Sequence, residues 1–348
     1  MRNEIDSWGQ PCSPRSYPSI EPEKGKRKAK TIQQKPVILV TEPLAEAPLA
    51  WLKSHAEVVE GGVDSPEFIR HSPSAIGLVV RTYTTVDDSV LKRLPRLKVV
   101  GRAGVGVDNI DLLACANRSV TVVHTPDANT QAVVEYALCL LADALRPRVF
   151  LDRALTLEAW EEARRKIVAP RQMNELTLGI LGLGRIGSRI AEVARAIGFR
   201  VLYNDLLEIS AERTSGALRV DSTTLFRESD VISIHIDGRP SNRDVVGAAL
   251  VNLMRPEVVL INTSRGIVIQ SAALAHFLHT HPQARAILDV HDPEPFTADH
   301  PLVGLPNAFL APHLASRTET AMVNMSWVVR DVIEVAMGRS AKHVAPGR

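Results

Sequence analysis

The chain has 348 residues and a formal net charge of +2, with 45% hydrophobic and 23% charged residues. This composition is that of a globular protein long enough for two domains, and the small net charge gives no attraction toward nucleic acid or a membrane surface. No stretch approaches the roughly 18 uncharged apolar residues of a membrane span. The three cysteines (Cys12, Cys115 and Cys139) lack CxxC spacing, so we expect a reducing, cytoplasmic location and no metal site.

Residues 1–35 differ in composition from the rest of the chain. They are rich in Pro, Ser and Lys, include the basic run KGKRKAK at Lys24–Lys30, and lack the apolar core of a signal peptide. This pattern favours a disordered tail. A targeting or polyanion-binding arm is the alternative interpretation.

From Pro36 onward, short apolar runs alternate with helix-like stretches, which is typical of parallel strands buried on both faces and joined by helical crossovers. The first runs are VILV (Val37–Val40), IGLVV (Ile76–Val80) and LKVV (Leu97–Val100). Thr130–Arg146 then has helical periodicity without a breaker and predicts a long connecting helix.

A second alternation predicts six more strands, and six strands with crossovers describe a doubly wound parallel sheet. The candidate segments are Leu176–Gly184, Arg200–Asp205, Asp230–Ile236, Val258–Ser264, Ala284–Val290 and Ala308–Pro312. The sequence therefore predicts an α/β protein with two Rossmann-like units of different size.

A glycine-rich loop follows the first strand of this second unit. In GILGLGRIG, Gly182, Gly184 and Gly187 lie between an apolar strand and helix-forming sequence. The first glycine permits a tight turn, the second lets the backbone approach a pyrophosphate, and the third lets helix and strand pack closely. The helix N-terminus attracts the phosphates. The spacing therefore predicts a dinucleotide site.

Asp205 ends the next predicted strand, in VLYND, about 20 residues beyond the glycines. A carboxylate here accepts hydrogen bonds from the adenosine ribose hydroxyls and repels a 2′-phosphate. No arginine follows directly, because Leu206 and Leu207 come next. NAD is therefore the predicted cofactor, and an exposed aspartate beside a glycine turn is the alternative.

Three polar residues follow later predicted strands, at the edge where open α/β sheets bind ligands. They are Arg265 in NTSRG, Glu294 in LDVHDPEP and His313 in APHLAS. Each alone could be a surface residue, a loop carboxylate or a helix cap. Together, Arg265 can grip a carboxylate through two hydrogen bonds, His313 can pass a proton to a carbonyl oxygen, and Glu294 can stabilise the imidazolium.

These motifs resemble those of the D-isomer-specific 2-hydroxyacid dehydrogenase family, which includes phosphoglycerate dehydrogenase and glyoxylate/hydroxypyruvate reductases. GRAGVGVDNID (Gly101–Asp111), GLGRIG, NTSRG, LDV…EP and PHLAS occur in the family's order and spacing, and the resemblance runs from about Val37 to Val335. It implies hydride transfer between nicotinamide C4 and C2 of a small 2-oxo or 2-hydroxy acid, such as hydroxypyruvate, glyoxylate or phosphohydroxypyruvate. It also makes a homodimer the expectation.

The resemblance also implies roles for individual residues. Arg265, Glu294 and His313 match the catalytic arginine, glutamate and histidine, and Asp289 matches the carboxylate that holds the nicotinamide carboxamide. Further expected cofactor contacts are Arg185, Ile186, Asp205, Ile236, Thr263 and Ser264, besides the three glycines. The expected substrate contacts are Val105 and Gly106, whose amides would receive the carboxylate, and Arg81 at the substrate's far end.

The family's domain organisation is discontinuous. We expect residues 36–130 and 317–340 to form the substrate domain and residues 131–316 to form the NAD-binding Rossmann domain, with His313 at the hinge. The chain ends soon after the last expected helix, so the C-terminal regulatory domain of the longer phosphoglycerate dehydrogenases is not expected.

Some features depart from the family pattern. The loop His235–Arg243 lacks the family's usual proline two residues after the histidine. Asp237, Gly238 and Arg239 are unusual there, and Arg239 could reach the adenosine side. His276–His281 could suggest a metal, but a surface helix end is the favoured interpretation. A dinucleotide-sensing binding protein, like the family's corepressors, keeps the same three residues and remains the alternative function.

Overall fold

The computed structural model describes residues 35–346. The tail predicted over residues 1–35, with its basic run, therefore lies outside the described residues except for Lys35. Within the described part, no helix has the length and apolar character required to cross a membrane.

The N-terminal part of the described chain forms a five-stranded sheet in the order β2-β1-β3-β4-β5, and all of its strand pairs are parallel. The strands are β1 (Val37–Val40), β2 (Glu57–Glu60), β3 (Gly77–Val80), β4 (Val99–Arg102) and β5 (Thr121–Val123). The three predicted strands are present. The two edge strands, β2 and β5, were not predicted from the sequence because each is short and only partly apolar.

Helices cover both faces of this first sheet, and a separate hydrophobic core lies under each face. They are α1 (Glu46–His55), α2 (Pro66–His71), α3 (Asp88–Lys92) and α4 (Leu112–Asn117). Ser65, Asp87 and Asp111 cap the last three by accepting hydrogen bonds from backbone amides of the first turn.

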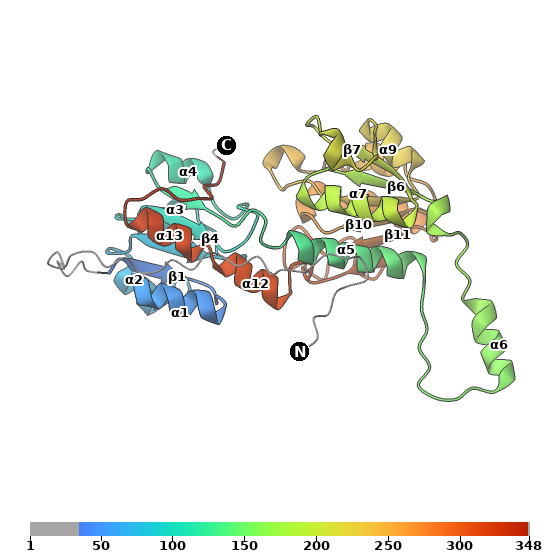
Figure 1. The fold of residues 1–348 in the computed structure, drawn as a ribbon, viewed down its shortest axis with the longest axis horizontal. Helices are drawn as coiled ribbons and strands as arrows, with labels where there is room; N and C mark the ends of the chain where they lie inside the picture. The colour runs from blue at the N-terminus through green and yellow to red at the C-terminus, as the bar shows by residue number, and fades with distance from the viewer. Residues whose placement is uncertain (1–34, 347–348) are drawn as a thin grey trace, which may run out of the picture. The chain divides into compact units, whose positions relative to one another are not determined.

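The last helix of the chain returns to this first sheet. After α12 (Glu319–Ser326), α13 (Val329–Ala336) packs beside α1 on one face, as Figure 1 shows. Val332 of α13 lies over two glycines of the sheet. A Cβ on Gly101 would stand 2.3 Å from Val332, and one on Gly77 would stand 3.1 Å from it. The first sheet is thus completed by residues from both ends of the described chain.

Residues 177–310 form a seven-stranded parallel sheet in the order β12-β11-β10-β9-β6-β7-β8. Its strands are β6 (Thr177–Leu181), β7 (Arg200–Asn204), β8 (Leu218–Arg219), β9 (Val231–Ile234), β10 (Val259–Asn262), β11 (Arg285–Leu288) and β12 (Ala308–Leu310). All six predicted strands are present, and the two-residue β8 adds a seventh. The strand order reverses beside β6, where doubly wound folds bind nucleotides.

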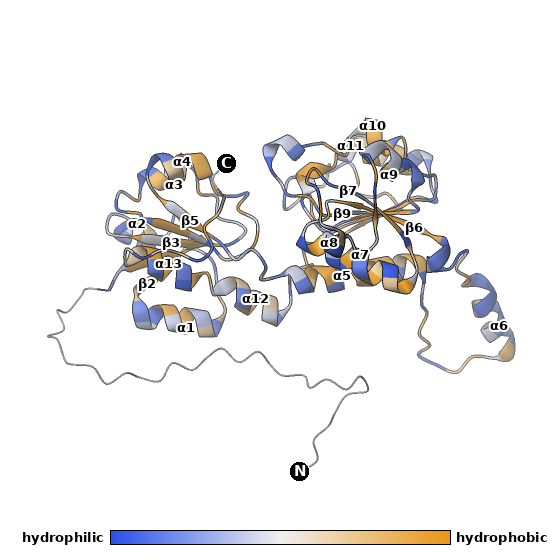
Figure 2. Cartoon of the chain, turned by 45° about the horizontal axis from the view of Figure 1, so that its top comes forward, coloured by the Kyte–Doolittle hydropathy of each residue, from blue (hydrophilic) through white to orange (hydrophobic). Residues whose placement is uncertain are grey.

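Helices also cover both faces of the second sheet. The predicted connecting helix is α5 (Thr130–Leu145), which packs with α7 (Arg185–Ile197) over one core, while α9 (Ser222–Glu228), α10 (Ala248–Val251) and α11 (Ser271–Thr280) flank the other. The short α8 is Ala211–Thr214, and three 3₁₀ turns lie at Met173–Glu175, Pro240–Asn242 and Gly266–Val268. In Figure 2 the strands of this sheet are coloured as hydrophobic, as expected for strands buried on both faces.

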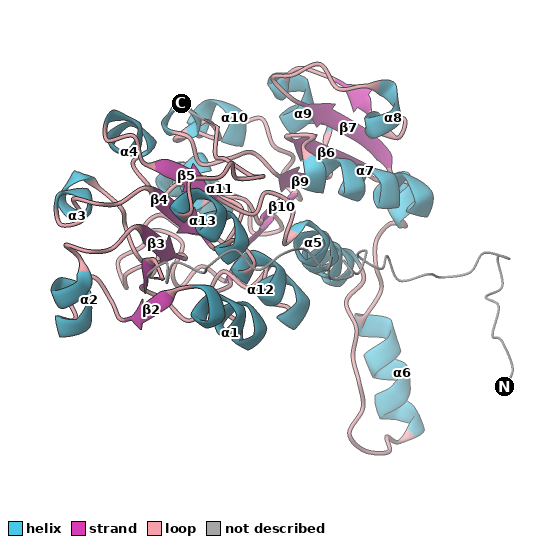
Figure 3. Ribbon diagram, turned by 60° about the vertical axis from the view of Figure 1, so that its left-hand side comes forward, coloured by secondary structure: helices cyan, strands magenta, loops and turns pink. Residues whose placement is uncertain are grey.

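Residues 148–172, here called the α6 arm, form an excursion between α5 and β6 that contains α6 (Leu157–Lys166). Figures 1 and 3 both show α6 standing apart at the end of long loops, and no residue of α6 is buried. The arm's large exposed apolar side chains are Val149, Phe150, Leu151, Leu157, Trp160, Ile167 and Val168.

The contact between α13 and the first sheet yields a stability prediction. Gly101→Ala places a methyl group where Val332 already lies, so overpacking should lower the free energy of unfolding by about 1–3 kcal/mol. Gly62→Ala is the matched control, because nothing lies within 4 Å of its added methyl group. Chemical denaturation measures both, and equal stabilities would contradict the close packing.

Candidate active site

The three predicted catalytic residues follow three adjacent strands of the second sheet. Arg265 lies beyond β10, Glu294 beyond β11 and His313 beyond β12, and these strands pair in parallel in that order. The carboxyl ends of parallel neighbours meet at one edge of a sheet, so the topology gathers the residues that the sequence places 19 to 48 positions apart.

Asn262 holds the turn that carries Arg265. Its side-chain oxygen accepts hydrogen bonds from the Ser264 amide (2.9 Å) and hydroxyl (2.7 Å), and its amide nitrogen donates to the Arg265 carbonyl (2.9 Å). Asn262 is buried, so these bonds are shielded from water. Sequence reasoning missed Asn262 because an asparagine at a strand end has no distinctive spacing.

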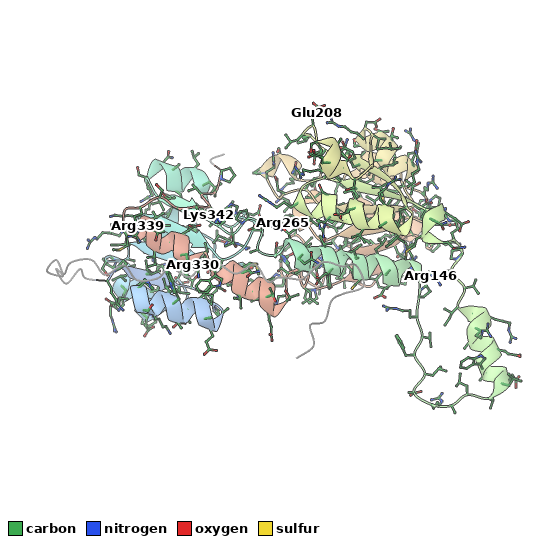
Figure 4. All side chains as sticks on the ribbon, in the orientation of Figure 1. Arg146, Glu208, Arg265, Arg330, Arg339 and Lys342 are labelled. Carbon is green, nitrogen blue, oxygen red and sulfur yellow. The ribbon has the colours of Figure 1, made fainter. Side chains whose placement is uncertain are left out.

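The Arg265 side chain reaches a turn of the first sheet. Its Nε donates to Asp108 Oδ2 at 2.8 Å and its Nη1 donates to the Ser264 carbonyl at 2.6 Å. A Cβ on Gly106 would stand 1.9 Å from Nη2, so the guanidinium lies directly against Gly106. The structure therefore brings Arg265, labelled in Figure 4, to the turn predicted to receive a substrate carboxylate.

Glu294 and His313 form a hydrogen-bonded pair, with His313 Nδ1 2.8 Å from Glu294 Oε2. The other carboxylate oxygen of Glu294 accepts from the His291 amide at 2.8 Å. Burial alone would raise the pKa of Glu294, but the bond to His313, its charge and the His291 amide outweigh burial and lower that pKa. An ionised Glu294 fixes the Nδ1 proton of His313 and leaves Nε2 for a substrate.

His313 has a left-handed backbone conformation, with φ of 56°, which is uncommon for a residue with a side chain. Asp289 supports this turn. Its carbonyl accepts from the His313 amide (2.9 Å), and its carboxylate oxygens accept from the amides of Leu314 (2.7 Å) and Ala315 (2.8 Å). Burial raises the pKa of Asp289 even though these amides act to lower it.

Arg265 is connected to the Glu294–His313 pair through the backbone. A Cβ on Gly266, the next residue, would stand 1.9 Å from the carbonyl carbon of His291. His291 in turn donates its amide to Glu294. Only glycine permits this approach, so the Arg265 turn is seated directly on the loop that carries Glu294.

The glycine loop has the geometry that its motif predicts. Gly182 has a φ of +92°, and a Cβ on Gly187 would stand 2.2 Å from the Gly182 carbonyl oxygen. Nothing lies within 4 Å of the Cβ position of Gly184, just before α7 begins at Arg185. The first turn of α7 contains no acidic residue, so its N-terminus suits an anionic pyrophosphate.

Asp205 lies beside this loop, with its carboxylate accepting from the amides of Leu183 (2.7 Å) and Leu207 (2.8 Å). Two arginines that sequence reasoning missed are close by. Arg213 donates to the Leu183 carbonyl at 3.2 Å, and Arg219 donates to the Asp205 carbonyl at 3.0 Å. A cavity of about 750 Å³ opens here, lined by Asp127, Thr130, Gly184, Arg185, Ser188, Arg189, Glu192, Glu212, Arg213 and Ser215.

The other predicted cofactor contacts are distributed around the same sheet edge. Ile236 lies against Gly182, since a Cβ on that glycine would stand 2.7 Å from Ile236 Cγ2, while Ile186 packs against the core under α5 and α7. Thr263 is buried, and its hydroxyl has no hydrogen-bond partner within the described residues. This hydroxyl and the open space at Gly184 both fit a bound dinucleotide.

Neighbouring side chains brace the turn that contains Val105 and Gly106. His124 Nδ1 lies 2.8 Å from the Val105 carbonyl, so this nitrogen carries the proton, and Thr125 donates both its amide and its hydroxyl to the Gly104 carbonyl. Burial lowers the pKa of His124. These two residues were not predicted.

Arg81 extends from a loop that is organised by Glu42. The Glu42 carboxylate accepts from the amides of Arg81, Thr82, Tyr83 and Thr84. Arg81 donates its side chain to the Pro43 carbonyl and lies 2.9 Å from the Met322 sulfur. Sequence reasoning missed Glu42, which lies about 40 residues before the amides it binds.

In the atypical loop His235–Arg243, Arg239 turns back on its own loop. Its guanidinium pairs with the Asp237 carboxylate, and Asn242 also donates to Asp237. Burial lowers the pKa of His235 to about 3, so that it is neutral, and its Nε2 lies 2.7 Å from the Ser233 hydroxyl. Over residues 35–346, no cluster of three or more potential metal ligands occurs, at His276–His281 or elsewhere.

The fold and site define a class of dinucleotide-binding α/β proteins with an arginine, a glutamate and a histidine at one sheet edge. Residues 138–315, about half of the chain, match the NAD-binding domain of the D-isomer-specific 2-hydroxyacid dehydrogenases. The chain belongs to this family.

Known relatives agree with this assignment. The chain is 34% identical to D-3-phosphoglycerate dehydrogenase of Archaeoglobus fulgidus over 86% of its own length but only 57% of that relative's. It is also 34% identical to glyoxylate reductase of Aeropyrum pernix, over 73% of this chain and 78% of the relative. A crystal structure of an NADPH-dependent glyoxylate/hydroxypyruvate reductase from Sinorhizobium meliloti superimposes with a TM-score of 0.77, at 26% identity, over 90% of this chain and 98% of that one.

The Glu294–His313 pair leads to a titration prediction. In His313→Asn the main influence that lowers the Glu294 pKa is lost while its burial remains, so this pKa should rise. Carboxyl-carbon NMR, with the resonance assigned from Glu294→Gln, measures the change. His279→Asn, on the exposed surface of α11, should leave it unaltered.

The lowered pKa of Glu294 also determines how this residue's contribution to the stability of the protein changes with pH. A carboxyl whose pKa is lowered by folding stabilises the protein above its unfolded pKa, and this contribution is lost as the pH falls through the folded pKa. Acidification below the ordinary glutamate pKa should therefore remove this contribution in the native protein. A Glu294 pKa that stays the same in His313→Asn would show that the two groups are uncoupled.

Proposed function

We propose that the protein is an NAD-dependent D-2-hydroxyacid dehydrogenase that interconverts a small 2-oxo acid and the corresponding D-2-hydroxy acid. The observation that carries this proposal is the position of Arg265 against the Gly106 turn, at the sheet edge that also carries the Glu294–His313 pair. One cationic group and one proton donor beside a dinucleotide loop are what reduction of a 2-oxo acid requires.

Each residue then has a defined task. Arg265 binds the α-carboxylate and carbonyl oxygen, while the Val105 and Gly106 amides receive the carboxylate. His313 holds a proton at Nε2 for the carbonyl oxygen, and Glu294 fixes the ring and stabilises its charged form. A bound nicotinamide dinucleotide would supply the hydride. Arg81 faces the far end of the substrate, and hydroxypyruvate, glyoxylate and phosphohydroxypyruvate are the candidates.

We assign the cofactor contacts to the glycine loop and its surroundings. Gly182, Gly184 and Gly187 with Arg185 and Ile186 would hold the pyrophosphate, and Asp205 the adenosine ribose. Asp289, already bonded to the Leu314 and Ala315 amides, would receive the nicotinamide carboxamide. Support for the remaining contacts comes from the unpartnered Thr263 hydroxyl and from the packing of Ile236 on Gly182; Ser264 completes the set.

We further propose a cytoplasmic homodimer in which the discontinuous substrate domain comprises residues 36–130 and 317–340 and the NAD-binding domain comprises residues 131–316. The α6 arm supports the dimer, because it exposes seven large apolar side chains and its helix buries none of its own residues. In this proposal a second copy of the chain packs against the apolar side chains of the α6 arm. A measurement of the molar mass in solution tests the dimer.

The arginine assignment gives an activity prediction. Arg265→Ala should lower kcat/KM for 2-oxo acid reduction by about 10²–10³ or more, because a preorganised partner of the reacting oxygen is lost. Arg265→Lys should recover only part, since the two-pronged geometry is absent. NADH oxidation across a panel of 2-oxo acids measures both, with Arg227→Ala as a surface control.

Two outcomes would redirect the proposal. Near-normal turnover in Arg265→Ala would overturn the role of this residue. If NADH binds tightly but no 2-oxo acid is reduced above background, the dinucleotide-sensing function becomes the better account, because a sensor needs the binding loop without the chemistry.

The ribose site gives a cofactor prediction. Hydrogen bonds from the ribose hydroxyls to the charged Asp205 acceptor are worth on the order of 1.5–3 kcal/mol each, so NADH should be preferred over NADPH by roughly 10²-fold. Asp205→Ala should narrow this ratio mainly by weakening NADH. Arg239→Gln should leave it unchanged, because Asp237 already binds that guanidinium.

Arg213 and Arg219 are the cations that could act against this preference, since both donate to backbone carbonyls beside Asp205. Their replacement by Gln in the Asp205→Ala background should reduce the remaining NADPH activity. An NADPH preference in the native protein, measured as kcat/KM with one 2-oxo acid, would overturn the NAD assignment.

A further inference from the structure

The guanidinium proposed to bind the substrate carboxylate is already bound to a carboxylate of the protein. Arg265 Nε donates to Asp108 Oδ2 at 2.8 Å across a sequence separation of 157 residues. Asp108 follows β4 and lies two residues beyond Gly106, in the turn whose amides would receive the substrate. A carboxylate of the protein thus takes one of the donors of the guanidinium that a substrate carboxylate would need.

Two glycines provide the space for this pair. A Cβ on Gly106 would stand 1.9 Å from Arg265 Nη2 and 2.5 Å from Asp108 Oδ2. A Cβ on Gly238 would stand 2.9 Å from both Arg265 Cγ and Asp108 Oδ1. Gly238 belongs to the atypical loop His235–Arg243, so the unusual residues of that loop border the Arg265–Asp108 pair directly.

The Arg265–Asp108 ion pair is weak enough for a substrate carboxylate to replace Asp108. Its side chains are 30% and 31% exposed, and ion pairs that water reaches contribute little net stability. Further guanidiniums interact electrostatically here: Arg265 and Arg81 both act on Arg102, and Arg317 acts on Arg81. The carboxylates of Asp108 and Glu42 act on Arg102 in the opposite direction, and a substrate carboxylate would add to them.

We propose that Asp108 is a positioning residue that holds Arg265 against the Gly106 turn and yields the guanidinium to the α-carboxylate of a 2-oxo acid. This inference rests on the proposed function. Asp108 keeps Arg265 against the Gly106 turn, and its carboxylate competes with the substrate carboxylate for the guanidinium. Its charge therefore sets the substrate KM, while the chemical step depends on Arg265 and His313.

The test is Asp108→Asn, which keeps the shape of the side chain and removes its charge. KM for the 2-oxo acid should fall about three- to fivefold, the scale of an ion pair partly open to water, while kcat changes less than twofold. Asp108→Glu keeps the charge and should not lower KM. Asp64→Asn is the surface control, because Asp64 is an exposed partner of Arg93.

Oxamate, an unreactive 2-oxo acid analogue, gives a second measurement. Its dissociation constant, titrated in the presence of saturating NADH, should fall in Asp108→Asn by the same factor as KM. A merely structural role for Asp108 would instead raise KM and the oxamate dissociation constant, or lower kcat, in both Asp108 variants.

The outcomes separate this inference from the proposed function. If the native protein reduces 2-oxo acids but Asp108→Asn shows an unchanged or raised KM, exchange at Arg265 is overturned while the dehydrogenase assignment stands. If the native protein reduces no 2-oxo acid, the proposed function fails. The oxamate titration then still tests whether Asp108 and an external carboxylate compete for Arg265. Unchanged oxamate binding in Asp108→Asn, or no oxamate binding to any variant, overturns it.

Discussion

The buried carboxylate of Asp289 is the constraint on which the active-site edge depends. This carboxylate accepts hydrogen bonds from the backbone amides of Leu314 and Ala315. The backbone carbonyl of Asp289 accepts a third bond, from the His313 amide. These three bonds help to hold the left-handed backbone of His313 against its steric cost. The Glu294–His313 hydrogen bond is made from this turn, so the position of the proposed proton donor depends on Asp289, which has no part in the proposed proton transfer.

Backbone packing extends this constraint to Arg265. Gly266 lies against His291, and His291 donates to Glu294, so the loops beyond β10 and β11 cannot shift independently. Asn262 fixes the other end of the Arg265 turn. The side chains that meet the substrate in our proposal are therefore positioned by Asn262 and Asp289, whose own side chains are buried.

Sequence patterns predicted the parts of this arrangement that have a local signal. Apolar runs identified the central strands, and the glycine spacing identified the turn before α7. The edge strands β2, β5 and β8 were missed because they are short, and no residue of β2 or β8 is buried. The helix α6 was missed because it has no buried face.

Within the site, Arg265, Glu294 and His313 were predicted from motifs. Glu42, Asp108 and Asn262 were not, because each acts through partners that only the fold or a turn geometry reveals. A carboxylate such as Asp108, whose partner lies 157 residues away, has no signature in a single sequence.

The return of α13 to the first sheet has a consequence for how the chain folds during synthesis. Ile38, Val79 and Val99 are emitted early from the ribosome, but the helix that covers their face begins only at Val329. The second sheet is translated completely within that interval and can fold as a unit. Until α13 is made, α1 is the N-terminal helix that covers this face of the first sheet, so part of the apolar surface that α13 later buries stays exposed during synthesis.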